Sequence, residues 1–137
     1  MRTIARALAA GVLCTLAPPV TAGKLDKAFE ALQVHNYFLA REILLGQVKK
    51  HPAAAWYGLS VITGRADNPF YQLDSSFFAI QRADAAFTTT DDRERVRIKK
   101  LGVDDDAIRA QRKHVNDVAW DQTRGLNTIA AYDRYIN

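Results

Sequence analysis

The chain has few of the residues that most often carry chemistry. It contains one cysteine, Cys14, and only three histidines among 137 residues. Cys14 lies in the N-terminal segment, so a chain without that segment forms no disulfide and offers no thiolate to a metal or a substrate. We therefore expect residues 23–137 to be stabilised by a single hydrophobic core, which a chain of this length can bury.

Motifs for catalysis and metal binding are also missing. His35, His51 and His114 have no second ligand-type residue at a spacing typical of metal sites, and we expect structural roles for them. The run Asp104–Asp106 lacks the alternating ligands, glycine and distal glutamate of an EF-hand loop, and should cap a helix instead. There is no GxSxG elbow and no glycine-rich phosphate loop. We expect neither an enzyme nor a protein that depends on a metal or cofactor.

The N-terminal segment has the three parts of a secretory signal peptide. Arg2 and Arg6 precede an apolar run over residues 7–17. The predicted cleavage follows Ala22, with Val20 and Ala22 at the −3 and −1 positions before it. The run is shorter than the roughly 20 residues that span a bilayer. We predict a cleaved signal peptide over residues 1–22. A retained membrane anchor and a lipid on the cysteine are the alternatives.

The net charge does not point to nucleic acid. The chain carries +4, and Arg2 and Arg6 contribute part of it, which leaves +2 for residues 23–137. No later apolar run is long enough for a transmembrane helix. We therefore expect no nucleic-acid partner.

Apolar residues recur at helical spacing from Leu25 onward. His35-Asn36 interrupts the spacing and predicts a tight turn between two antiparallel helices. We expect Lys49, Lys50 and His51 to close the second helix before Pro52. The apolar positions of this pair are Leu25, Ala28, Phe29, Leu32, Ala40, Ile43, Leu44 and Val48.

The same arrangement then returns. Residues 53–64 predict a helix, residues 65–72 a longer loop, and residues 73–87 a partner helix. The expected inner side of the partner helix carries Leu73, Phe77, Ile80 and Phe87. Aligning the partner helices pairs Ala40 with Ser76, 36 residues later, and an offset of this size is typical of a helical repeat.

The C-terminal part predicts three further helices. Thr90 or Asp91 should cap a short basic helix that ends before Gly102, although the alternation in "RVRIK" also fits a strand. A longer helix follows the aspartate run, with Gly125 as its expected stop. "NTIAAYDRYIN" begins one more helix. We expect the repeat domain to be truncated at its C-terminus or to lack the polar element that normally covers the end of a solenoid.

The stretch "HNYFLA" and its surroundings resemble the tetratricopeptide repeat (TPR) family, whose helix–turn–helix units of about 34 residues stack into a superhelix. Tyr37 and Ala40 match the family's turn motif, and Pro52 takes the place of its closing proline. Ala131 and Tyr135 take the small and large positions of a later unit. The repeats are degenerate, since the first helix lacks the family's tryptophan and Gly-Tyr signals.

This resemblance implies an all-α, TPR-like solenoid of about two and a half repeats, with the helix at residues 91–102 inserted between the second and third. Related exported proteins imply the cell envelope of a Gram-negative bacterium, in the periplasm or outer envelope. The implied function is a non-catalytic scaffold for a protein or peptide. One alternative is a recognition module of a larger envelope protein or enzyme.

The first helix of each pair would line a concave groove in such a solenoid. This predicts partner contacts from Lys24, Lys27, Glu30 and the exposed parts of Trp56 and Ser60. Phe70 and Tyr71 follow Pro69 in the long loop, where two consecutive aromatic residues are difficult to bury together, so they are further candidates.

The basic segment offers a second candidate surface. It would dock a peripheral protein on anionic lipid or polysaccharide, while its alternative role is a solvated helix face. Its cationic residues are Arg93, Arg95, Arg97, Lys99 and Lys100.

Overall fold

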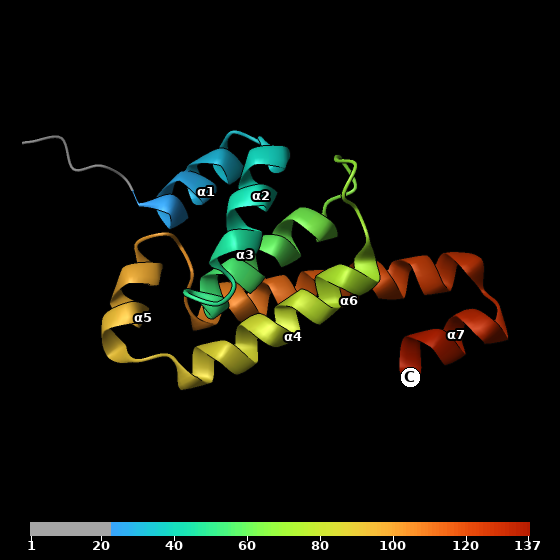
Figure 1. Cartoon of the computed structure of the whole chain (residues 1–137). Coiled ribbons are helices and arrows are strands. Elements are labelled where there is room, and N and C mark those ends of the chain that lie inside the picture. Colours follow the sequence, from blue (N-terminus) through green and yellow to red (C-terminus); the bar gives the residue numbers. More distant parts are fainter. Residues whose placement is uncertain (1–22) are drawn as a thin grey trace, which may run out of the picture.

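The computed structural model describes residues 23–137, so the predicted signal peptide lies outside the described residues. Over this range the chain is all-α, with seven helices and no strand, and the short basic segment is a helix rather than a strand. The helices are α1 (Lys24–Gln33), α2 (Tyr37–Gln47), α3 (Pro52–Gly64), α4 (Leu73–Thr89), α5 (Asp92–Lys99), α6 (Asp105–Leu126) and α7 (Ile129–Ile136) (Figure 1).

The predicted turn between α1 and α2 is confirmed. His35 adopts a left-handed backbone with φ of 59°, and the Asn36 side chain accepts a hydrogen bond from the Leu39 amide at 3.3 Å. The expected end of α2 is wrong in detail, because the helix stops at Gln47 and the two lysines lie in the following turn. His51 is the N-cap residue of α3 rather than the end of α2, and Pro52 begins α3, where its missing N–H costs nothing.

Helices α3 and α4 lie against each other at close range because small residues line their contact. The buried hydroxyl of Ser60 donates to the Ser76 carbonyl at 3.0 Å, and the Ser76 hydroxyl donates to the Ser60 carbonyl at 2.7 Å. A Cβ atom on Gly64 would approach the Ser76 Oγ to 2.7 Å. These contacts place the middle of α3 beside the first turns of α4 and fix the antiparallel register of the pair.

The inner side of α4 differs from the prediction at Phe77. The face toward the core consists of Ser76, Ala79, Ile80 and Ala83, whereas Phe77 is 40% exposed. A phenylalanine ring does not fit between two helices that approach this closely, so small side chains occupy the contact.

The C-terminal helices begin and end on local signals. Asp91 caps α5 by accepting from the Glu94 amide, and Asp104 caps α6 by accepting from the Ala107 amide. Gly125 is not the stop of α6, which continues to Leu126 and ends where Asn127 turns left-handed at φ 46°. Thr128 then caps α7.

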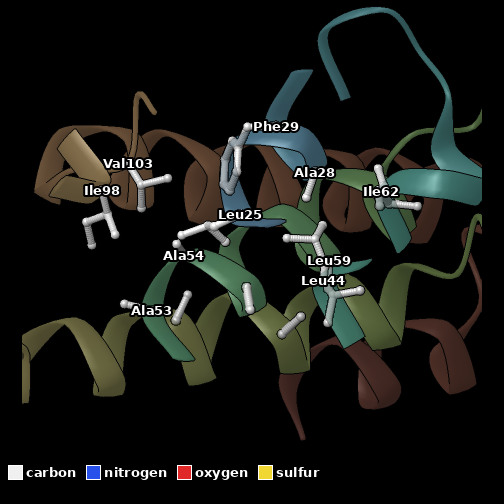
Figure 2. Close-up of a cluster of buried hydrophobic side chains, with 14 of the residues drawn as sticks. Leu25, Ala28, Phe29, Leu44, Ala53, Ala54, Leu59, Ile62, Ile98 and Val103 are labelled. Carbon is white, nitrogen blue, oxygen red and sulfur yellow. The ribbon is translucent and has the colours of Figure 1, made fainter. Parts of the chain in front are cut away.

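The core is centred on α3, which packs against α1, α2, α4 and α6. Leu25 and Phe29 of α1 reach it from one side, and Ile98 and Val103 join it from α5 and the segment that follows (Figure 2). Helix α6 also packs on α4 and α7, but α7 contributes no buried residue. None of the helices in residues 23–137 combines the length and the apolar character needed to cross a bilayer.

Candidate functional site

A surface depression of about 600 Å³ lies between α2, α3, α4 and the loop at residues 65–72. We call it the aromatic groove. Eight of its twelve lining residues are apolar or aromatic, and no aspartate or glutamate contributes to it. Its lining residues are Arg41, Leu45, Trp56, Leu59, Thr63, Pro69, Phe70, Tyr71, Gln72, Ser75, Phe78 and Ala79.

The loop wall of the groove is held in place by hydrogen bonds. The Asn68 side-chain amide donates to the Ile62 carbonyl at 2.9 Å, and its oxygen accepts from the Phe70 amide at 2.9 Å. The Gln72 amide donates to the Thr63 carbonyl at 2.8 Å. The loop therefore presents its aromatic residues from a fixed backbone.

Phe70, which lines the groove, contacts two residues of α2. The Arg41 guanidinium lies over the Phe70 ring at 4.9 Å from its centroid, and the Phe38 ring meets the same ring edge-on at 4.8 Å. Cation–π and edge-to-face contacts of this kind stabilise partly exposed rings. Arg41, which is partly exposed, thereby lies in the lining of the groove.

The lining of the groove also combines aromatic residues of α3 and α4. Trp56 and Phe78 meet edge-to-face with ring centroids 5.9 Å apart. The Arg82 guanidinium lies 4.7 Å from the Phe78 centroid and 5.9 Å from that of Trp56. Both contacts therefore combine an arginine with two aromatic rings, but Arg41 itself lines the groove, whereas Arg82 lies beside it over two of the lining rings.

Neither arginine has a carboxylate partner within residues 23–137. The ion pairs in this range involve Arg65, Arg109, Arg112, Lys113, Arg124, Arg134 and the imidazole of His51. The groove therefore presents positive charge without local neutralisation.

Tyr71 connects the groove to two other depressions. It contributes to all three, and its hydroxyl accepts a hydrogen bond from the Gln122 side chain of α6 at 2.6 Å. The depression of about 390 Å³ between α4, α6 and α7 is crossed by an ion pair of Arg134 with Asp74. Its charges are therefore already paired, unlike those of the aromatic groove.

The predicted partner-binding residues separate into two groups. Trp56, Phe70 and Tyr71 meet in the aromatic groove, whereas the exposed residues Lys24, Lys27 and Glu30 of α1 do not line it. The two loop aromatics are each partly buried, with Phe70 facing α2 and Tyr71 bonded to α6.

The prediction that Ser60 is partly exposed is wrong, since this residue is fully buried against α4. The register of α3 explains this, because the small side chains of the helix face its partner while Trp56 faces the groove.

Sequence reasoning missed the three residues Arg41, Phe78 and Arg82. The pair Phe77-Phe78 held a usable signal, because neighbouring residues on a helix point in different directions and cannot both face one core. Arg82 follows Phe78 by four residues, which brings the two side chains together on a helix surface.

The predicted basic surface on α5 is only partly available to a partner. Arg95 donates from Nε to the Thr90 carbonyl and from Nη2 to the Phe87 carbonyl, each at 2.9 Å, so it covers the C-terminal end of α4. The exposed cations are Arg93, Arg97, Lys99 and Lys100.

A polar contact ties α5 to the turn before α3. His51 is 5% exposed, and its Nδ1 lies 2.6 Å from the Glu94 Oε1. Its Nε2 lies 3.5 Å from Nη1 of Arg97. This cluster satisfies a buried imidazole, and it positions α5 beside the N-terminal end of α3.

The pKa values of Tyr57 and Asp67 differ from their ordinary values. Burial, together with the Asp104 carboxylate, raises the pKa of Tyr57 above its ordinary value. Hydrogen bonds from Arg65 lower the pKa of the exposed Asp67 carboxyl, which helps to hold the loop at the end of α3.

The described residues contain no group of three or more potential metal ligands drawn from histidine, cysteine, aspartate and glutamate. No known protein family, curated protein or solved structure matches the chain. The geometry of the aromatic groove is therefore the basis for a functional assignment.

Proposed function

We propose that the chain is a non-catalytic scaffold that is exported to the cell envelope and binds a protein or peptide segment in the aromatic groove. The observation that carries the proposal is the groove itself. It gathers aromatic residues from α3, α4 and a fixed loop around a space of about 600 Å³. Aromatic and arginine side chains dominate the affinity of many protein interfaces.

The order of the helices supports the same proposal. Packing between consecutive helices, with α1 against α3 and α3 against α6, is what stacked helical hairpins would produce. We propose on this basis that the pairs α1–α2, α3–α4 and α6–α7 are degenerate TPR-like units, with α5 inserted. Ala40 and Leu44 are as completely buried as Ser76 and Ile80, their aligned counterparts.

A displayed library of random peptides, selected on the purified chain, tests the proposal. Phe78→Ala should lower the affinity for the selected peptides about tenfold or more, because it removes an aromatic wall of the groove. Phe77→Ala is the matched control, since Phe77 is the neighbouring exposed ring and does not line the groove. Peptide binding that responds equally to both changes would place the site elsewhere.

The exposed cations of α5 favour a second candidate function, which is peripheral docking on anionic lipid. Arg97 and its neighbours lie beside Gly23, where the described chain begins. Binding to phosphatidylglycerol vesicles should then fall steeply with added salt and should weaken in Arg93→Gln and Arg97→Gln. Binding only to neutral vesicles, or none, would contradict this candidate.

A further inference from the structure

We infer that the aromatic groove selects peptide segments in which an acidic residue lies next to an aromatic or large aliphatic residue. This inference rests on the proposed function, because it names the class of peptide that the same groove binds. It is carried by Arg41, which lines the groove, and by Arg82, which lies over the lining rings of Phe78 and Trp56.

The stacking geometry leaves the arginines competent to bind a carboxylate. A guanidinium lying over a ring uses its π face for that contact, while its N–H donors point outward in its own plane. Within residues 23–137 no carboxylate pairs with either Arg41 or Arg82. Their donors are therefore pre-positioned for a carboxylate from another molecule, which they can bind through two parallel hydrogen bonds.

The groove also requires an apolar group in its ligand. Leu45 and Phe78 line it and are each 48% exposed, so both leave substantial apolar surface in contact with water. Covering that surface contributes roughly 25 cal/mol for each Å² removed from solvent. A purely acidic peptide would leave it uncovered, and a purely apolar peptide would leave the arginines unpaired.

Charge complementarity favours an acidic ligand over a basic one. No aspartate or glutamate lines the groove, so a lysine or arginine of a ligand would meet the like charge of Arg41 in the lining and of Arg82 beside it. Like charges brought together at an interface oppose binding, and this excludes basic segments.

The experiment is selection of a displayed random peptide library on the purified chain, followed by fluorescence anisotropy with synthetic copies of the selected peptides. Aspartate or glutamate should be enriched beside phenylalanine, tyrosine, tryptophan or leucine. Arg41→Gln or Arg82→Gln, whichever removes the arginine paired with the acidic residue, should weaken binding of that peptide about tenfold, as expected for the loss of a charge-assisted hydrogen bond. Arg93→Gln on α5 is the control for general electrostatic attraction and should have little effect.

A second comparison uses a peptide whose acidic residue is replaced by its amide. On the unchanged chain this peptide should bind about tenfold more weakly, whereas on the variant that lacks the arginine paired with the acidic residue the two peptides should bind alike. Circular dichroism of each variant checks that it is folded.

The outcomes separate the inference from the proposed function. Selected peptides that lack acidic residues but still lose affinity in Phe78→Ala would overturn the acidic preference and leave the scaffold function standing. If no selected peptide depends on Phe78, both the inference and the proposed function fail.

Discussion

Individual residues of this chain obey local rules closely, and His35 is the clearest departure. Its φ of 59° lies in the left-handed region, where a side chain with a Cβ is strained by roughly 1–2 kcal/mol. Glycine adopts this conformation without that strain, because it has no Cβ atom.

We predict that His35→Gly raises the free energy of unfolding by roughly 0.5–1 kcal/mol. The relief of backbone strain should exceed both the greater freedom of glycine in the unfolded chain and the lost stacking on Tyr37. Urea unfolding followed by circular dichroism measures the change. His114→Gly, at a position inside α6, is the control and should destabilise by about 1 kcal/mol. A loss of stability in His35→Gly would mean that the ring stacking outweighs the strain.

Tyr57 gives a prediction for alkaline pH. Burial and the Asp104 carboxylate raise its pKa above 10.0, so the folded state favours the protonated phenol. The resulting contribution to stability is complete below pH 10.0 and is lost as the pH rises through the higher folded-state pKa.

Ultraviolet absorbance of tyrosinate should therefore show a titration step above pH 10.0 that is absent in Tyr57→Phe. Asp104→Asn should move this step to lower pH while keeping an N-cap for α6, because asparagine caps as well as aspartate. If Tyr57→Phe instead removes a titration step at or below pH 10.0, the phenol is not shielded as described.

At the scale of the element, all seven helices and most of their boundaries could be predicted from the apolar spacing, capping residues and prolines. The error at Phe77 shows where this reasoning stops. Periodicity identifies a face but not the distance of the neighbouring helix, and that distance decides whether a phenylalanine or an alanine fits. The small residues Ser60, Gly64 and Ser76 determine it between α3 and α4.

Gly64→Ala should lower the free energy of unfolding by about 1–3 kcal/mol, because the new Cβ would approach the Ser76 Oγ to 2.7 Å. Gly46→Ala is the matched control within α2. No atom lies within 4 Å of its added Cβ, so the change should stabilise by about 0.5–1 kcal/mol.

The double variant Gly64→Ala/Ser76→Ala tests the cause of the loss. Without the Oγ, the nearest atom of residue 76 would be its Cβ at 3.6 Å, an ordinary contact distance. Denaturant unfolding should therefore give a smaller loss for the double variant than the sum of the two single losses. Strict additivity would show that the clash is not with the serine hydroxyl.

At the scale of the whole molecule, the candidate site was only half predictable. The aromatic residues of α3 and the loop were identified as candidates, but their assembly with Arg41 depends on how the loop folds back against α2. The His51–Glu94 contact joins residues 43 apart, and no local pattern signals it. Both features arise from tertiary packing, which composition and spacing do not encode directly.

Helix α7 should be the least stable part of the described chain. Helix α7 buries no residue, and Ile129 and Ile136 are 82% and 77% exposed. We predict that removing residues 128–137 lowers the free energy of unfolding by less than about 2 kcal/mol, since the main core is untouched. Urea unfolding monitored by tryptophan fluorescence measures this, and Trp120, which contacts Tyr132 and Tyr135, should become more exposed. Loss of cooperative unfolding would instead make α7 part of the folding unit.

The packing of successive helices against one another also has a kinetic consequence. Helices α1, α2 and α3 each pack on the next helix in the chain, and α6 packs on α7, whereas the contacts of α1 with α3 and of α6 with α3 and α4 join segments further apart. Contacts between segments close in sequence require little loop closure, and helical proteins of this kind fold in microseconds to milliseconds. A chain built in this way can acquire its structure progressively from α1 onward, whereas the docking of α5 and α6 must wait for residues distant in sequence.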